Sequence, residues 1–132
     1  MGTDGSGTAS EAVKQAAELA RKFDAELVLL SAFDKRSGAS SGGDERQWTR
    51  NSASVVRSKL ERAEAELSNA GINCRTIIDE GDPADVIVRL AEECGADMLV
   101  IGNKGMKRRV LGSVPNKVTH KADCSVLVVK TS

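Results

Sequence analysis

The segment from Gly102 to Ser113 carries the residue types that bind anions. It reads G-N-K-G-M-K-R-R-V-L-G-S and follows an apolar run at 97–101. Glycines let the backbone approach a ligand closely, and successive backbone N–H groups can then surround an anion. A helix predicted after the loop adds its positive N-terminal end, and Ser113 adds a hydroxyl donor. The cations that would raise the local potential are Lys104, Lys107, Arg108 and Arg109. The segment indicates a phosphate site, but a plain strand-to-helix turn with solvated cations fits the same spacing.

Two standard phosphate-binding motifs are excluded. The P-loop requires G-x-x-x-x-G-K-[S/T], and no Lys follows Gly112. The dinucleotide fingerprint G-x-G-x-x-G is also absent. A nucleotide at this loop would therefore bind through some third arrangement.

The elements that would position this loop alternate between helices and short buried strands. Hydrophobic periodicity predicts helices over 11–23 with Ser10 as N-cap, 48–70, 83–95 and 114–120, and strands over 26–33, 73–80, 97–101 and 125–130. This order predicts an α/β domain with an open parallel sheet and helices on both faces, spanning residues 1–132. Ligands of such sheets collect at the carboxyl ends of the strands. Three segments should meet there: the T-D-G-S turn with Asp4, the segment after Ser31-Ala32-Phe33, and the Gly102 loop.

The beginning of the chain is unusual for this architecture. Asp4-Gly5-Ser6 resembles the turn that leads out of a strand, but only three residues precede Asp4. We expect either a short stub in the place of a first strand or the omission of a segment. Asp4 is interpreted as a ligand-binding carboxylate, with turn formation as the alternative.

Composition narrows the classes of function. The 132 residues carry 19 basic and 19 acidic side chains and only 2% aromatic residues, which argues against binding a nucleic acid. Three separated cysteines without a C-x-x-C pair argue against a disulfide framework or a zinc site and predict buried free thiols. No apolar run approaches the roughly 20 residues of a membrane span. We therefore expect a soluble cytoplasmic domain.

Three further features have ordinary structural interpretations. His120, the only histidine, lies near a predicted helix end without the partners that a catalytic triad requires. Asp82 precedes Pro83 and is predicted to be an N-cap rather than an acid catalyst. The last strand, Ser125 to Lys130, presents an apolar edge on which a second copy could pair.

At several places the chain resembles the universal stress protein family. The matching segments are G-T-D-G-S at 2–6, G-D-P-A-D-V-I-V-R-L-A at 81–91, A-D-M-L-V-I-G-N-K-G at 96–105, and L-G-S-V-P-N-K-V-T-H-K-A-D-C-S-V-L-V-V-K at 111–130. The resemblance implies a five-stranded parallel sheet of the adenine-nucleotide α-hydrolase-like kind, whose first strand is truncated here. It also implies a homodimer formed through the last strand.

In one branch of that family, ATP or another adenine nucleotide is held by G-x-x-G, nine residues, and G-[S/T]. Carried over by position, the resemblance implies binding roles for Asp4, Ala32, Gly102, Asn103, Gly105, Gly112, Ser113 and Val114, with Mg²⁺ on the phosphates as an option. Asp4 and the backbone near Ala32 would approach the adenine and ribose. The spacing departs from the pattern, because only six residues, Met106 to Leu111, separate Gly105 from Gly112. One hypothesis is that the sequence omits residues here too, which would leave an abnormal Cα–Cα gap between Met106 and Val110.

The preferred interpretation is an adenine-nucleotide-binding, homodimeric stress-response protein that acts as a sensor or regulatory module. The first alternative is a dimerising interaction module of the same fold that binds no nucleotide. The second is an ATPase or nucleotidyl-transfer enzyme, for which the sequence offers no dedicated catalytic set. Any ATP hydrolysis is expected to be slow.

Overall fold

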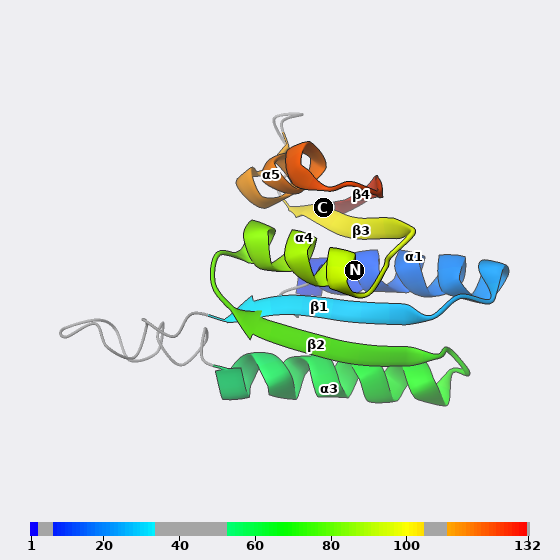
Figure 1. The fold of residues 1–132 in the computed structure, drawn as a ribbon. Coiled ribbons are helices and arrows are strands. Elements are labelled where there is room, and N and C mark those ends of the chain that lie inside the picture. The colour runs from blue at the N-terminus through cyan, green and yellow to red at the C-terminus, as the bar shows by residue number, and fades with distance from the viewer. Residues whose placement is uncertain (3–6, 34–52, 105–110, 132) are drawn as a thin grey trace.

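A computed structural model describes residues 1–2, 7–33, 53–104 and 111–131 of the chain. Within these ranges, four helices alternate with four strands (Figure 1): α1 (Gly7–Phe23), β1 (Leu27–Phe33), α3 (Ala53–Asn69), β2 (Cys74–Glu80), α4 (Pro83–Glu93), β3 (Met98–Lys104), α5 (Ser113–Lys121) and β4 (Ser125–Thr131). The predicted alternation is confirmed. The predicted start of the second helix at Trp48 lies outside the described residues.

The strands form two parallel pairs joined by the beginning of the chain. β1 pairs with β2, and β3 pairs with β4. Gly2 lies between the pairs and forms parallel bridges with Leu30 on β1 and Ile101 on β3. The order across the layer is therefore β2, β1, Met1–Gly2, β3, β4, and the place of a fifth, central strand is held by the two-residue stub that the sequence suggested.

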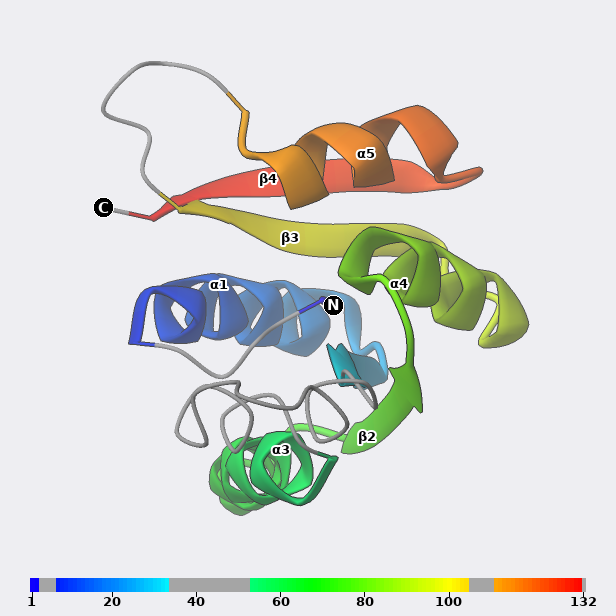
Figure 2. The ribbon, with the colours of Figure 1, turned by 90° about the vertical axis from the view of Figure 1, so that its left-hand side faces the viewer.

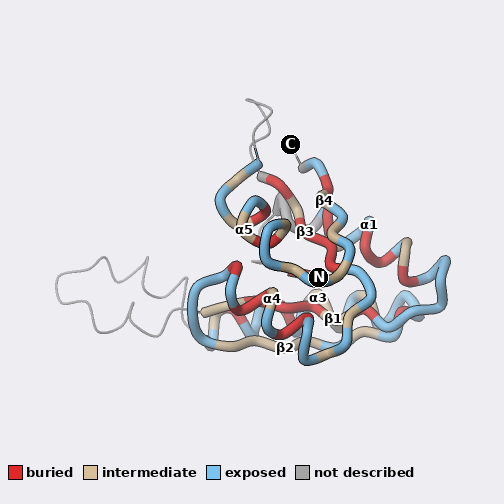
Figure 3. Tube along the Cα trace, turned by 45° about the horizontal axis from the view of Figure 1, so that its top comes forward, coloured by how far each residue is buried: buried red, intermediate tan, exposed pale blue. Residues whose placement is uncertain are grey.

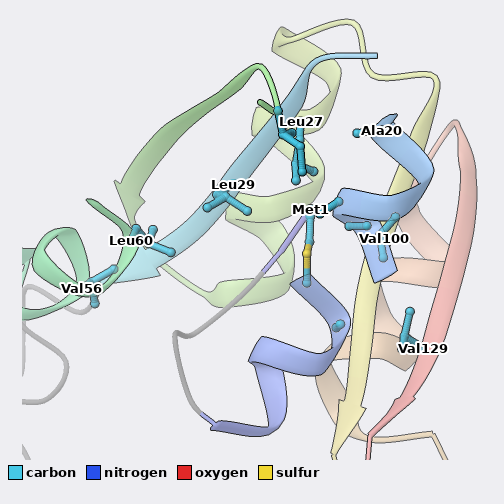
Figure 4. Packing of buried hydrophobic residues seen from close by; sticks show 12 residues of the cluster. Met1, Ala20, Leu27, Leu29, Val56, Leu60, Val100 and Val129 are labelled. Atoms are coloured by element: carbon cyan, nitrogen blue, oxygen red, sulfur yellow. The ribbon is translucent and has the colours of Figure 1, made fainter. Parts of the chain in front are cut away.

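Two hydrophobic clusters pack the helices onto the layer. Figure 2 shows the helices along the strands, and Figure 3 shows which stretches of the chain are buried. One cluster joins the alanines of α1 and Val56 and Leu60 of α3 to Met1, Leu29 and Val100 (Figure 4). The other joins the apolar face of α4 and Val118 of α5 to β1 and β3. Small and branched aliphatic side chains fill both clusters, as expected of a chain with few aromatic residues.

Helix ends follow local chemistry. Asp82 caps α4, because its carboxylate accepts a hydrogen bond from the Asp85 N–H at 3.3 Å and Pro83 takes the first helical position. Gly71 and Gly95 follow α3 and α4 with φ of 84° and 68°, a conformation that favours glycine at the end of a helix. The cap predicted at Ser10 is wrong, because α1 already begins at Gly7.

No helix in the described part of the chain is long and apolar enough to cross a membrane.

Candidate functional site

The carboxyl end of β3 lies against the start of α5. β3 extends three residues beyond Ile101, where the strand was predicted to end, so that Gly102 and Asn103 belong to the strand. The Asn103 side chain is fully buried, and its Oδ1 accepts a hydrogen bond from the backbone N–H of Gly112 at 2.8 Å. This bond joins the two ends of the loop that the sequence singled out. Asn103 therefore fixes where α5 begins relative to β3.

Gly112 is the N-cap of α5, and its backbone is extended with φ of −63°. Ser113 is the first residue inside the helix, so the N-cap position falls to Gly112. Among the described residues, no side chain forms a cap hydrogen bond at this helix end. Pro115, the third helical residue, has no N–H to offer. The backbone N–H groups of Ser113 and Val114 lie in the first turn of α5, beside the positive end of the helix dipole, where such groups can donate to an anion.

A side chain at position 112 would crowd this junction. A Cβ placed on Gly112 would lie 3.2 Å from Asn103 Oδ1 and 3.6 Å from Pro115 Cδ. Glycine at this position thus permits a close approach of the loop to the strand rather than a positive φ. The sequence motif identified this glycine, but for its partner Asn103 it predicted a contact with the nucleotide and not this buried hydrogen bond.

Of the eight residues that the resemblance implicated, five come together at this junction: Gly102, Asn103, Gly112, Ser113 and Val114. Ala32 lies near the end of β1, on the other side of Met1–Gly2. Because β1 and β3 both run parallel to their partners and both bridge Gly2 in parallel, their carboxyl ends lie at the same edge of the layer. Asp4 and Gly105 lie outside the described residues, as do Lys107, Arg108, Arg109 and the segment of the supposed Cα gap.

Ion pairs join α5 to α4 next to this junction. Lys117 Nζ lies 2.9 Å from Asp82 Oδ2 and 3.3 Å from Asp85 Oδ2, and Lys121 Nζ lies 2.8 Å from Asp85 Oδ1. The hydrogen bond from Lys117 and that from the Asp85 backbone N–H lower the pKa of Asp82. Hydrogen bonds from Lys121 and Lys117 likewise lower the pKa of Asp85. These carboxylates are ionised partners of lysines, so Asp82 is not poised to act as an acid.

The remaining candidates offer no second reaction centre in the described part of the chain. His120 is exposed, and its Nδ1 lies 2.9 Å from the Asn116 carbonyl oxygen. Cys74, Cys94 and Cys124 are free but half-buried rather than buried as predicted. Across residues 1–2, 7–33, 53–104 and 111–131, no group of acidic, His or Cys side chains could hold a metal ion.

A depression of about 210 Å³ lies at the opposite end of the layer, between the end of α4 and the start of β4. Its lining includes Ala91, Glu92, Asp123 and Cys124. A hydrogen bond with Asp123 raises the pKa of Glu92. This depression is separate from the loop junction and shares no residue with it.

Comparisons with known proteins agree with this architecture. The sequence model of the universal stress protein family matches residues 1–130. A universal stress protein of Mycobacterium tuberculosis is 35% identical over 141 aligned residues, covering 100% of this chain and 94% of the relative. A putative universal stress protein of Staphylococcus haemolyticus is 32% identical, covering 99% of this chain and 82% of the relative.

Solved structures give the same result. The crystal structure of a universal stress protein in complex with cAMP is 33% identical, with a TM-score of 0.79 and coverage of 100% of this chain and 95% of that one. A universal stress protein of Arabidopsis thaliana with AMP bound is 26% identical, with a TM-score of 0.62 and coverage of 90% and 78%. The match extends over the whole described layer and the loop junction, and the chain belongs to the universal stress protein family.

Proposed function

We propose that this chain binds an adenine nucleotide at the carboxyl ends of β1 and β3 and acts as a homodimeric sensor or regulatory module of the stress response. The observation that carries the proposal is the Asn103–Gly112 hydrogen bond of 2.8 Å, which holds the uncapped start of α5 against the end of β3. Helix starts held in this way bind phosphate groups through backbone N–H donors. The solved relatives with cAMP and AMP support an adenine nucleotide as the ligand class.

Each residue has a role that follows from its place. The N–H groups of Ser113 and Val114 bind the phosphate, and the Ser113 side chain, which is exposed, adds a hydroxyl donor. The backbone near Gly102 and Ala32 contacts the ribose and adenine. Asp4 and Gly105 complete the site on the strength of the sequence motif, with Asp4 accepting hydrogen bonds from ribose hydroxyls. ATP, with or without Mg²⁺, and cAMP are the two ligands to be distinguished.

A charge placed in the loop tests this site. Gly105→Asp puts a carboxylate where the motif places phosphate, so nucleotide binding should be lost while the thermal midpoint stays unchanged. Asn73→Asp is the matched control, because it adds the same charge at an exposed position before β2, at the opposite end of the layer. Calorimetric titration with ATP and with cAMP gives the affinities. Equal affinity of the wild type and Gly105→Asp would remove the loop from the site.

The homodimer is proposed to form through the outer edge of β4. β4 pairs with β3 on one side, and no other described strand lies along its outer edge. Leu127 on this strand is 37% exposed and is one of four exposed large apolar side chains in the described part of the chain. An unpaired apolar edge favours pairing with a second copy. Native mass spectrometry of freshly purified protein would report the oligomeric state and any retained nucleotide together.

A further inference from the structure

The contact with α4 largely sets the orientation of α5. The helix has nine residues, and it packs more extensively against α4 than against β3 or β4 (Figure 2). Two of its residues, Pro115 and Val118, are buried. The bond between Asn103 and Gly112 fixes where the helix begins, but a single bond does not fix the tilt of the helix axis. Polar contacts with α4 therefore contribute to the direction of the first N–H groups of α5.

Lys117 is the first charged residue of α5 and lies one turn after Ser113, on the same side of the helix. Its Nζ is shared between Asp82 at 2.9 Å and Asp85 at 3.3 Å. Hydrogen bonds to these two carboxylates raise the pKa of Lys117, so that it is charged at neutral pH. Lys121, one turn further along, pairs with Asp85. Lys117 thus joins the start of α5 to the N-cap of α4.

Asp82 is tied in turn to the end of β1. Gly81, directly before it, donates its N–H to the Phe33 carbonyl at 3.1 Å. Phe33 follows Ala32, whose backbone lies on the adenine and ribose side of the proposed site. A chain of contacts therefore runs from the end of β1 through Asp82 and Lys117 to the start of α5. It connects the two sides of the proposed nucleotide site.

Asp82 can act on a bound phosphate in two opposite ways. Its carboxylate suits the positive end of α4, which it caps, but a negative charge at this edge of the layer also repels an anion at the start of α5. Through Lys117, the same carboxylate holds α5 in place. The first effect weakens binding of a phosphate and the second strengthens it, so the sign of a measured change separates them.

We propose that Asp82 and Lys117 are positioning residues, whose ion pair directs the N–H groups of Ser113 and Val114 at the bound phosphate and couples occupancy of that site to the start of α4. This inference rests on the proposed nucleotide site. Coupling is reciprocal, so a nucleotide that binds better when the pair is formed must also favour the pair. Both side chains are half-exposed, and pairs of this kind are weak, so the expected change in affinity is about two- to fivefold.

The first test measures affinity by calorimetric titration with ATP and with cAMP. Lys117→Met removes the ammonium and keeps most of the length of the side chain, and it should weaken binding about two- to fivefold. Lys117→Arg keeps the charge and should retain most of the affinity. Lys121→Met is the matched control, because it removes the same charge from the same helix one turn further from the phosphate. Its affinity should fall less.

Asp82→Asn gives the sign of the effect. It removes a negative charge near an anion site and keeps an oxygen that can cap α4. Positioning through Lys117 predicts weaker binding, whereas charge repulsion alone predicts tighter binding. Asp79→Asn is the control, because Asp79 pairs with Arg89 at 2.7 Å and has no pair with α5. This control should not weaken binding.

Amide hydrogen exchange tests the same pair without nucleotide. If Lys117 holds α5, the Gly112 N–H, which is bonded to Asn103, should exchange faster in Lys117→Met than in the wild type or in Lys121→Met. By reciprocity, the nucleotide should slow exchange of the Asp85 N–H, which donates to Asp82, in the wild type but not in Lys117→Met.

Three results would overturn the positioning role. The first is an Asp82→Asn variant that binds nucleotide as tightly as the wild type or more tightly. The second is an equal loss of affinity in Lys117→Met and Lys121→Met. The third is unchanged exchange at Gly112 in Lys117→Met. A wild type that binds neither nucleotide would contradict the proposed function and this inference together, whereas these three results, obtained with a wild type that binds, contradict the inference alone.

Discussion

Replacing Asn103 by Ala should loosen the junction on which the proposed nucleotide site is built. The substitution removes a fully buried acceptor and leaves the Gly112 N–H, 2.8 Å away, without its partner. An unsatisfied buried donor costs about 1–3 kcal/mol, and the small cavity adds to this. We expect a loss of about 2 kcal/mol in the free energy of unfolding, which lowers Tm by about 6–10 °C for a chain of this size.

The same change should lower the affinity for the nucleotide more strongly than it lowers the stability of the fold. Because α5 is no longer held to β3, the N–H groups of Ser113 and Val114 lose their preset direction, and affinity should fall at least tenfold. Denaturant unfolding and calorimetric titration measure the two effects. Asn73→Ala is the control, since Asn73 is exposed and surface changes usually stay within about 0.5 kcal/mol. A variant at position 103 with unchanged Tm and affinity would refute the role of the hydrogen bond.

Three further predictions concern other parts of the chain. Val128→Pro should dissociate the proposed homodimer, whereas Val128→Ala should not, because the strand register turns the Val128 N–H to the outer edge of β4. Size-exclusion chromatography with light scattering measures the oligomeric state of both variants, and an unchanged mass for Val128→Pro would contradict the proposed interface. Gly81→Ala should cost about 1–3 kcal/mol, because φ is 135° and the new Cβ would lie 3.2 Å from Val86 Cγ2; denaturant unfolding that matches wild type would contradict this. Asp82→Asn keeps an oxygen that can cap α4 but loses the charge that pairs with Lys117. Because folding lowers the pKa of Asp82, the stabilisation from its ionised form is present above the unfolded pKa and is lost as pH falls through the folded pKa. The stability of Asp82→Asn should therefore differ from that of the wild type near neutral pH and converge with it in acid. A difference in stability that does not change with pH would exclude the ion pair.

Sequence periodicity predicted the order of the elements because each helix and strand buries one apolar pattern. The Asp82–Pro83 signal placed the start of α4 correctly, since capping is a local effect. The end of β3 was missed, because Gly102 and Asn103 are poor strand formers and only pairing with β4 makes them extended. Local propensity carries no information about such pairing.

The glycines of the loop identified the candidate site from the sequence, but the hydrogen bond between Gly112 and Asn103 was not predicted. Asn103 is polar, and polarity predicts a surface position, yet its side chain is fully buried because it satisfies the Gly112 N–H nine residues away. Residue type alone favours Ser113 over Gly112 as an N-cap, whereas the register of α5 gives that place to Gly112. The roles of Asp4 and Gly105 stay predictions that rest on the motif.

The most direct test of the central claim is an amide NMR titration of the whole chain with ATP and, separately, with cAMP. The proposed site predicts saturable shifts of the Gly112, Ser113 and Val114 resonances with at least one of these nucleotides, while Asn73 at the opposite end of the layer stays unmoved. Saturable binding that leaves the start of α5 unperturbed, or no binding of either nucleotide at millimolar concentration, would contradict it.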